Sequence, residues 1–212
     1  MRLSNNVIKL DCANRSYVYL VQVKTGWVMI DTGFPKLSSK IIAELSSYNI
    51  KPNDIKFILL THGDVDHIGN LRELLNIFNC KVYADASEIP YLAKKKSYGF
   101  RKWLFKILLH IPKFNNVIPL PVPEIESIKI IRTPGHTPEH VCYVYQDFLF
   151  AGDLICTEDN SFSLLPDKYV FNKLQNIDSI KSLRVNNINW VCPAHGEPIR
   201  SSKNWSEFIN KL

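Results

Sequence analysis

Hydrophobic and polar residues in the first third of the chain alternate at the spacing of short β-strands, with one helical stretch among them. Strands are predicted over the runs VIKLDC, SYVYLVQV and WVMID, and an amphipathic helix is predicted over residues 36–48. The continuous apolar run at 56–60, KFILL, is typical of a buried strand. It leads directly into the polar segment 61–67, and a polar segment at the end of a buried strand is a candidate site.

The same patterns return in the second half of the chain, after a proline-rich turn at 119–123. A helix over 68–78 and a strand near 81–84 are predicted before that turn. The elements predicted after it are strands at 127–132, 141–145 and 148–151, a helix over 167–183, a strand at 190–192 and a terminal helix from Ser201. We expect one domain over residues 1–212, because this length is usual for a single domain and no linker interrupts it.

The net charge of +6 arises from one segment, residues 86–118, called here the basic segment. It holds seven of the 26 basic residues and one of the 20 acidic residues, so 19 of each sign remain elsewhere. We interpret it as a lid-like insertion that covers an apolar substrate or contacts acyl chains or a membrane surface. Nucleic-acid binding is the alternative, although no nucleic-acid-binding motif accompanies the lysines and rings. Its basic residues are Lys94, Lys95, Lys96, Arg101, Lys102, Lys106 and Lys113, and the aromatic residues among them are Tyr91, Tyr98, Phe100, Trp103 and Phe105.

The cysteines indicate a reducing compartment. There are five of them, widely spread and never in a CxxC pair, which is typical of reduced thiols rather than of a disulfide framework. The amino-terminal residues lack the unbroken apolar core of a secretory signal, and no stretch approaches membrane-spanning length. We therefore expect a cytoplasmic protein.

Four of the six histidines stand at the ends of predicted strands with acids or glycines beside them. His62 and His67 lie in THGDVDHIG, His136 in TPGHTPEH and His195 in PAHGEP, and Asp153 in AGDL joins them. A metal ion needs imidazoles and carboxylates that converge from different parts of the chain, and strand ends on one edge of a sheet hold such groups rigidly. The pattern therefore predicts a metal site.

These motifs, in their order and spacing, resemble the signature of the metallo-β-lactamase superfamily. The resemblance covers residues 7–199. It implies an α+β fold of the four-layer αββα sandwich type, built from two αβ halves with the motif loops along an open edge. The five motifs are Asp31-Thr32-Gly33, Thr61-His62-Gly63-Asp64-Val65-Asp66-His67, Gly135-His136, Gly152-Asp153 and His195-Gly196.

The resemblance also implies two divalent metal ions and a role for each polar residue of the motifs. The first metal is assigned to His62, Asp64 and His136, the second to Asp66, His67 and His195, and both are bridged by Asp153. Asp66 is further expected to orient the nucleophilic hydroxide and to carry a proton to the leaving group. Asp31 is expected to anchor the neighbouring loops by accepting hydrogen bonds. His110 and His140 are not expected to be ligands.

Asp64 departs from the family, most of whose members have His at this position. A carboxylate replaces a neutral nitrogen donor with a charged oxygen donor and so favours a harder metal. Zinc is the expected metal, and iron or manganese is the alternative that Asp64 opens, since the flavodiiron branch of the superfamily has a carboxylate here and binds iron. A second alternative is that Asp64 turns away from the metals and accepts backbone hydrogen bonds in its own loop.

The resemblance implies a metal-dependent hydrolase in which a metal-bridging hydroxide cleaves an ester, thioester or lactone bond in a small molecule. The sequence has no Gly-x-Ser-x-Gly elbow and no phosphate-binding glycine loop, which fits a metal-activated nucleophile. Antibiotic hydrolysis is not expected, because dinuclear β-lactamases generally have Cys where this chain has Asp153. The alternatives are a non-haem iron redox enzyme and, less favoured, a nucleic-acid phosphodiesterase. The sequence fixes neither the substrate nor the oligomeric state.

Overall fold

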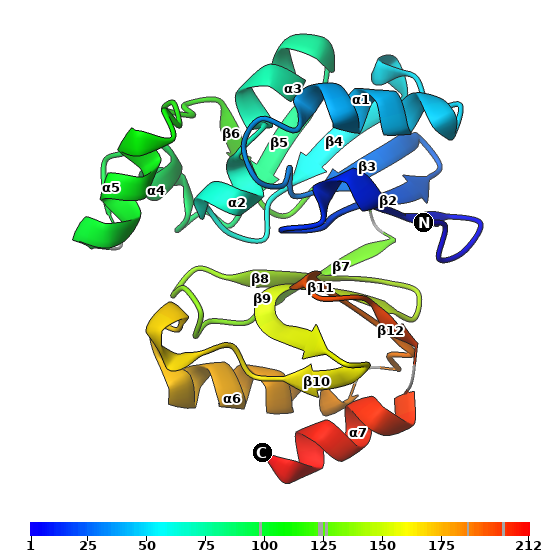
Figure 1. The fold of residues 1–212 in the computed structure, drawn as a ribbon, viewed down its shortest axis with the longest axis vertical. Helices are drawn as coiled ribbons and strands as arrows, with labels where there is room; N and C mark the ends of the chain where they lie inside the picture. Colours follow the sequence, from blue (N-terminus) through cyan, green and yellow to red (C-terminus); the bar gives the residue numbers. More distant parts are fainter. Residues whose placement is uncertain (98, 123–124, 126, 186, 201) are drawn as a thin grey trace. The chain divides into compact units, whose positions relative to one another are not determined.

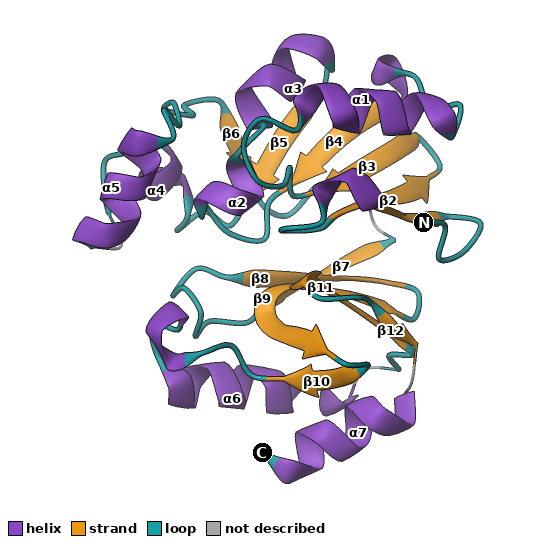
Figure 2. Cartoon of the chain, viewed as in Figure 1, coloured by secondary structure: helices purple, strands orange, loops and turns teal. Residues whose placement is uncertain are grey.

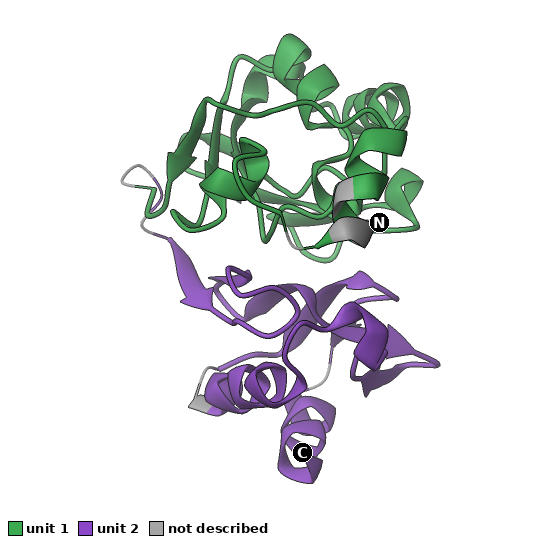
Figure 3. Cartoon of the chain, turned by 90° about the vertical axis from the view of Figure 1, so that its left-hand side faces the viewer, with its two compact units in different colours: residues 1–122 green, residues 123–212 purple. Residues whose placement is uncertain are grey.

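The computed structural model describes residues 1–97, 99–122, 125, 127–185, 187–200 and 202–212, and the side chains of all of these except residues 100, 101, 103 and 185. The chain divides into two compact units, Met1–Val122 and Pro123–Leu212 (unit 1 and unit 2; Figure 3). Each unit consists of one β-sheet and helices (Figure 2). Among the described residues, no helix is both long enough and apolar enough to cross a membrane.

Unit 1 contains a six-stranded sheet in the order β1-β2-β3-β4-β5-β6 (Figure 1). The first three strands pair antiparallel, and β3 to β6 pair parallel. The strands are β1 (Val7–Leu10), β2 (Val18–Val23), β3 (Gly26–Ile30), β4 (Ile55–Leu59), β5 (Lys81–Ala84) and β6 (Val117–Pro119), and the helices are α1 (Ser38–Ser47), α2 (Val65–Ile68), α3 (Leu71–Ile77), α4 (Ile89–Leu92) and α5 (Phe100–Leu108).

The core of unit 1 lies between this sheet and helices α1 and α3. Ile41 and Leu45 of α1 and Leu74 of α3 are buried in one apolar cluster with strand residues such as Leu20 and Ile58. Because β3, β4 and β5 are parallel, their carboxyl ends lie at the same edge of the sheet. The polar residues that follow these strands are therefore delivered to one edge, which positions the predicted site residues of this unit.

Unit 2 contains a second sheet in the order β12-β11-β9-β8-β7, with β10 paired to β9. Strands β9 and β11 are parallel and the remaining pairs are antiparallel. Apolar residues of the sheet pack with α6 and α7 in one cluster that includes Leu149, Val191, Ile180 and Trp205. The strands are β7 (Ile128–Arg132), β8 (Val141–Tyr145), β9 (Phe148–Glu158), β10 (Ser161–Ser163), β11 (Trp190–His195) and β12 (Ile199–Arg200), and the helices are α6 (Lys173–Ser182) and α7 (Ser202–Lys211).

Two predicted helices differ from the observed ones for identifiable reasons. The helix predicted over 68–78 is broken after Ile68, because the Asn70 side chain bonds the carbonyls of Thr32 and Phe34 and the amide of Leu37. The helix predicted from residue 167 begins at Lys173, where the Asn172 side chain accepts a bond from the amide of Gln175 at 3.1 Å. The Asn70 side chain thus competes with continued helix, whereas the Asn172 side chain caps the start of α6. The predicted start of the last helix, Ser201, lies outside the described residues.

The basic segment is more closely joined to the core than its composition predicts. Strand β6 extends the sheet of unit 1, and Leu92, Ile111 and Phe114 are buried in the core cluster of that unit. Tyr98 and the side chains of Phe100, Arg101 and Trp103 lie outside what the structure describes. The single domain with an insertion at 86–118 stays a prediction.

Candidate metal centre

The loop after β4 carries four of the predicted ligands of unit 1. His62 follows the strand closely and is fully buried, and Asp64 occupies the N-cap position of the one-turn helix α2. Asp66 and His67 lie on that helix. The His62 Nε2 lies 3.6 Å from Asp64 Oδ2, and the His67 Nε2 lies 3.9 Å from Asp66 Oδ2. Two imidazole–carboxylate pairs are thus formed within one loop.

The segment after β3 holds this loop in place. Asp31 is buried, and its carboxylate accepts hydrogen bonds from the Thr61 amide at 2.8 Å and from the Thr61 hydroxyl at 2.7 Å. The same carboxylate lies 2.8 Å from His67 Nδ1. Thr32 adds two bonds to the carbonyl of His67, from its amide at 2.7 Å and from its hydroxyl at 2.8 Å. With Nδ1 donating to Asp31, the neutral imidazole keeps the lone pair of Nε2 available to a metal.

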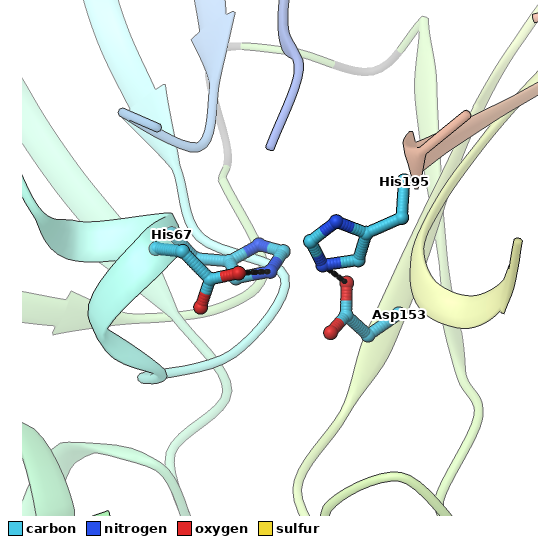
Figure 4. A group of neighbouring side chains, drawn as sticks. His67, Asp153 and His195 are labelled. Atoms are coloured by element: carbon cyan, nitrogen blue, oxygen red, sulfur yellow. Dashed lines mark ion pairs between the residues drawn. The ribbon is translucent and has the colours of Figure 1, made fainter. Parts of the chain in front are cut away.

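Unit 2 carries the other predicted ligands around one buried carboxylate. Asp153 lies in β9, with Oδ2 3.5 Å from His136 Nε2 and Oδ1 3.3 Å from His195 Nε2. Each oxygen of this carboxylate therefore faces one histidine. Figure 4 shows the side chain of His195 directed at Asp153, with that ion pair dashed, and also draws His67 of α2.

These separations match what a shared metal ion requires. Two ligand atoms that each lie about 2.1 Å from one tetrahedral ion are about 3.4 Å apart. The four imidazole–carboxylate pairs between predicted ligands of the same unit range from 3.3 to 3.9 Å. A direct hydrogen bond between such groups is shorter, typically about 2.7–2.9 Å when it is charge-assisted. The residues present therefore fit a cation better than they fit ion pairs with each other.

His140 supports Asp153 rather than acting as a ligand. It is fully buried, its Nδ1 lies 2.8 Å from the Thr133 hydroxyl, and its Nε2 accepts a bond from the Asp153 amide at 3.2 Å. Both ring nitrogens are thus used within the protein. The sequence analysis did not assign this positioning role, although the four-residue spacing from His136 in TPGHTPEH was a signal for it.

Two glycines of the motifs permit close backbone approaches that a side chain would prevent. Gly135 has φ +147, and a Cβ there would lie 2.3 Å from the Cα of Asn176. Gly196 has φ +90, and a Cβ there would lie 2.0 Å from the carbonyl oxygen of Thr157. The loops that carry His136 and His195 therefore pack directly against the neighbouring backbone.

The unusual residue Asp64 contacts the basic segment. Its side chain makes no capping bond to α2, and its Oδ2 forms an ion pair with the Nζ of Lys102, from α5, at 2.5 Å. The pKa of the nearby Lys106 is lowered by burial and by the like charges of Lys102 and Lys94, while Glu88 and Asp64 act to raise it. The sequence analysis did not predict this contact between positions 38 residues apart.

The sequence pattern of the metallo-β-lactamase superfamily matches residues 13–195, which is most of the chain. The chain belongs to the metallo-β-lactamase superfamily. It is 30% identical over 167 residues to the probable metallo-hydrolase YflN of Bacillus subtilis, covering 71% of this chain and 63% of that protein. It is 32% identical to a hydroxyacylglutathione hydrolase of Francisella tularensis subsp. novicida, covering 66% of this chain and 48% of the other. The chain thus spans about half to two thirds of these two relatives.

Solved structures of the superfamily share the fold. A metallo-β-lactamase superfamily protein from Sulfolobus tokodaii, ST1585, has a TM-score of 0.72 at 22% identity, covering 98% of this chain and 86% of that one. This likeness and the two sheets with their helices confirm the predicted α+β fold class of the metallo-β-lactamase type, and the sequence match over residues 13–195 confirms the predicted family. The ligand assignment and the roles of Asp31 and Asp66 stay predictions.

Proposed function

We propose that this superfamily member is a hydrolase that holds two divalent cations and cleaves an ester, thioester or lactone bond in a small molecule. The observation that carries the proposal is the spacing of 3.3 to 3.9 Å in the four imidazole–carboxylate pairs formed between predicted ligands within each unit. Relatives named metallo-hydrolases support the reaction class. The relative whose name specifies hydroxyacylglutathione, a thioester, supports an acyl substrate.

The motif order of the superfamily assigns each of these residues to a metal. Unit 1 contributes His62 and Asp64 to the first ion, and Asp66 and His67 to the second. Unit 2 would contribute His136 to the first ion and His195 to the second, and Asp153 would be a ligand of both. We take zinc as the metal, with iron or manganese as the alternative favoured by the Asp64 carboxylate.

Two bound cations supply a water of lowered pKa, from about 15.7 to near 7 for zinc, and polarise the substrate carbonyl. The protein residues then set the geometry of the reaction. The side chain of Asp66 is 27% exposed, so it can reach a water and the leaving group, orient the first and carry a proton to the second. Asp31 and His140 hold His67 and Asp153 in fixed orientations, which keeps the cost of reorganisation low during the reaction.

Metal analysis of matched variants tests the proposal. The purified protein should contain two equivalents of metal and hydrolyse at least one member of an ester, thioester and lactone panel. Asp153→Ala should lose at least one equivalent and most of the activity. Asp178→Ala, which changes an exposed acid on α6, should keep both. Full metal content and activity in Asp153→Ala would show that the bridging assignment is wrong.

An iron redox enzyme is the second candidate, and the carboxylate of Asp64 is the observation that favours it. The two candidates differ in metal content and in oxygen use. Protein expressed with iron and zinc both supplied should carry zinc and consume no oxygen if it is a hydrolase. Stoichiometric iron together with reductant-dependent oxygen consumption, and no turnover on the acyl panel, would favour the redox enzyme.

The cytoplasmic location is also a proposal. All five cysteines are free, as expected for a protein kept in a reducing compartment. The expected contact of the basic segment with acyl chains or a membrane surface is likewise a proposal, supported by the exposed apolar residues Leu104, Phe105 and Leu108 of α5.

A further inference from the structure

A pocket of about 230 Å³ lies within the basic segment of unit 1. Five of the residues that line it are lysines, and no acidic residue is among its described lining residues. The pocket is therefore a concentrated positive site rather than part of an evenly charged surface. Its lining residues are Tyr91, Lys94, Lys95, Lys96, Ser97, Lys102, Lys106 and Ile107.

A tight turn after α4 brings three lysines to the pocket that two lysines of α5 also line. After α4, Lys94 adopts a positive φ of 54°, and the amides of Lys95 and Lys96 both bond to the carbonyl of Pro90, at 2.8 and 3.1 Å. The turn places three consecutive lysines on the same pocket as Lys102 and Lys106, which are four residues apart on one side of α5. Consecutive side chains in a regular helix or strand would diverge.

The described acids near the pocket act on two of its five lysines. Lys102 pairs with Asp64, and the partly buried Lys106 is influenced by Glu88 and Asp64. Lys94, Lys95 and Lys96 are exposed and bring three further positive charges. Like charges held this close repel one another, and burial adds a desolvation cost for Lys106. A multiply charged anion in the pocket would offset both effects.

We propose that this lysine pocket binds the phosphate group of a small-molecule substrate, whose acyl bond is then cleaved at the metal centre. Lysine ammoniums suit phosphate as point charges, and a doubly charged group offsets more of the pocket's charge than one carboxylate does. The small volume favours a single anionic group over a nucleic-acid strand, which needs an extended groove with stacking rings. Lys102 joins the two sites, because it lines the pocket and contacts Asp64. This inference rests on the proposed function.

Binding of inorganic phosphate and of glycerol phosphate to the metal-loaded protein tests the pocket directly. We expect calorimetry to show saturable binding that weakens as salt is raised. Lys96→Gln should weaken it about tenfold, because one charge-assisted hydrogen bond is lost. Lys113→Gln makes the same change of charge in the same segment but at an exposed position outside the pocket, and should change binding less than about threefold. Metal content is measured for both variants, so that a loss at the metal centre is recognised.

Two further arms identify the source of the phosphate. A pair of acyl thioesters that differ only in a terminal phosphate should differ at least tenfold in KM, and Lys96→Gln should remove that difference. Vesicles of phosphatidic acid, compared with vesicles of phosphatidylcholine, test a lipid headgroup as the source. Binding to the phosphatidic acid vesicles without binding of the soluble phosphates would overturn the small-molecule assignment.

Failure of this inference is distinguishable from failure of the proposed function. Equal binding of phosphate by the wild-type protein and Lys96→Gln would overturn the pocket, whether or not the protein hydrolyses esters. Phosphate binding that depends on Lys96, without hydrolysis of any acyl substrate, would leave the pocket as an anion site and overturn its role in substrate choice.

Discussion

Replacing Asp31 with asparagine should change the proton position on His67 without changing the shape of the site. The Asp31 carboxylate accepts two bonds from Thr61 and lies 2.8 Å from His67 Nδ1. Asparagine has one acceptor oxygen, and if this oxygen stays on the Thr61 amide, its NH2 group faces the histidine. The Nδ1 of His67 must then accept a hydrogen bond, so the ring proton moves to Nε2 and occupies the lone pair that a metal would need.

The expected loss follows from the contacts. Replacing the hydrogen-bond partner of a ligand histidine typically costs about 10–100-fold in metal affinity, which equals about 1.4–2.8 kcal/mol. The loss of one hydrogen bond to a charged group costs about 1.5–3 kcal/mol, so two independent estimates agree. Competition with a chelator of known affinity should therefore show one weakened site in Asp31→Asn, with the affinity of the other site within about threefold of wild type.

A matched variant separates this effect from loss of packing. Asp85 follows the neighbouring parallel strand, is also buried, and accepts a bond from the Ser87 amide at 2.9 Å. Asp85→Asn should keep both metal affinities. Thermal unfolding of Asp31→Asn in excess chelator should lie within a few degrees of wild type under the same conditions. If Asp31→Asn holds both metals as tightly as Asp85→Asn does, the orienting role of Asp31 is refuted.

Three other predictions concern separate parts of the molecule. Asp64→His should keep two metals but shift the metal preference toward zinc. It should also move the rise of the pH–rate profile to lower pH, because a less anionic set of ligands makes the bound water more acidic. Metal analysis and pH–rate curves check these outcomes. Burial raises the pKa of the thiols of Cys12 to about 12 and of Cys80 to about 11, so at pH 8 the folded protein should react with iodoacetamide at these sites at least about a hundredfold more slowly than the urea-unfolded protein. Gly135→Ala should destabilise the fold by about 2–3 kcal/mol in a thermal melt, because its Cβ would meet the backbone of α6. Gly99→Ala should cost less, since Gly99 also has a positive φ but has open space around it.

The sequence predicted the elements whose cause is local. The run KFILL is apolar throughout and became the buried strand β4, and the motif after it marked the candidate site. Strand β6 was missed, because its three residues form a strand through pairing with the edge of β5 rather than through their own pattern. The same holds for the two-residue strand β12, which depends on β11.

Contacts between residues far apart in the sequence could not be predicted from the local pattern. The pair of Lys102 with Asp64 joins two segments whose separation in sequence gives no periodic signal. His140 shows the same limit, since its bond to the Asp153 amide depends on how β8 and β9 pair. The ligand motifs could be found because their order is shared by a whole superfamily, whereas the supporting contacts depend on this chain's own packing.

The described side chains of helix α5 depart from the usual polarity of a surface helix. Leu104, Phe105 and Leu108 are exposed, while Lys102 and Lys106 are partly buried and Lys102 pairs with Asp64. Leu104, Phe105 and Leu108 keep 36 to 61% of their surface exposed, so the ion pair of Lys102 with Asp64 contributes to the attachment of the helix beside apolar packing. The docking of α5 should therefore depend on the ionic conditions of the solution as well as on the packing of the fold. High ionic strength, or a cation that claims the carboxylate of Asp64, weakens that attachment, so the same protein would present two different surfaces according to its ions.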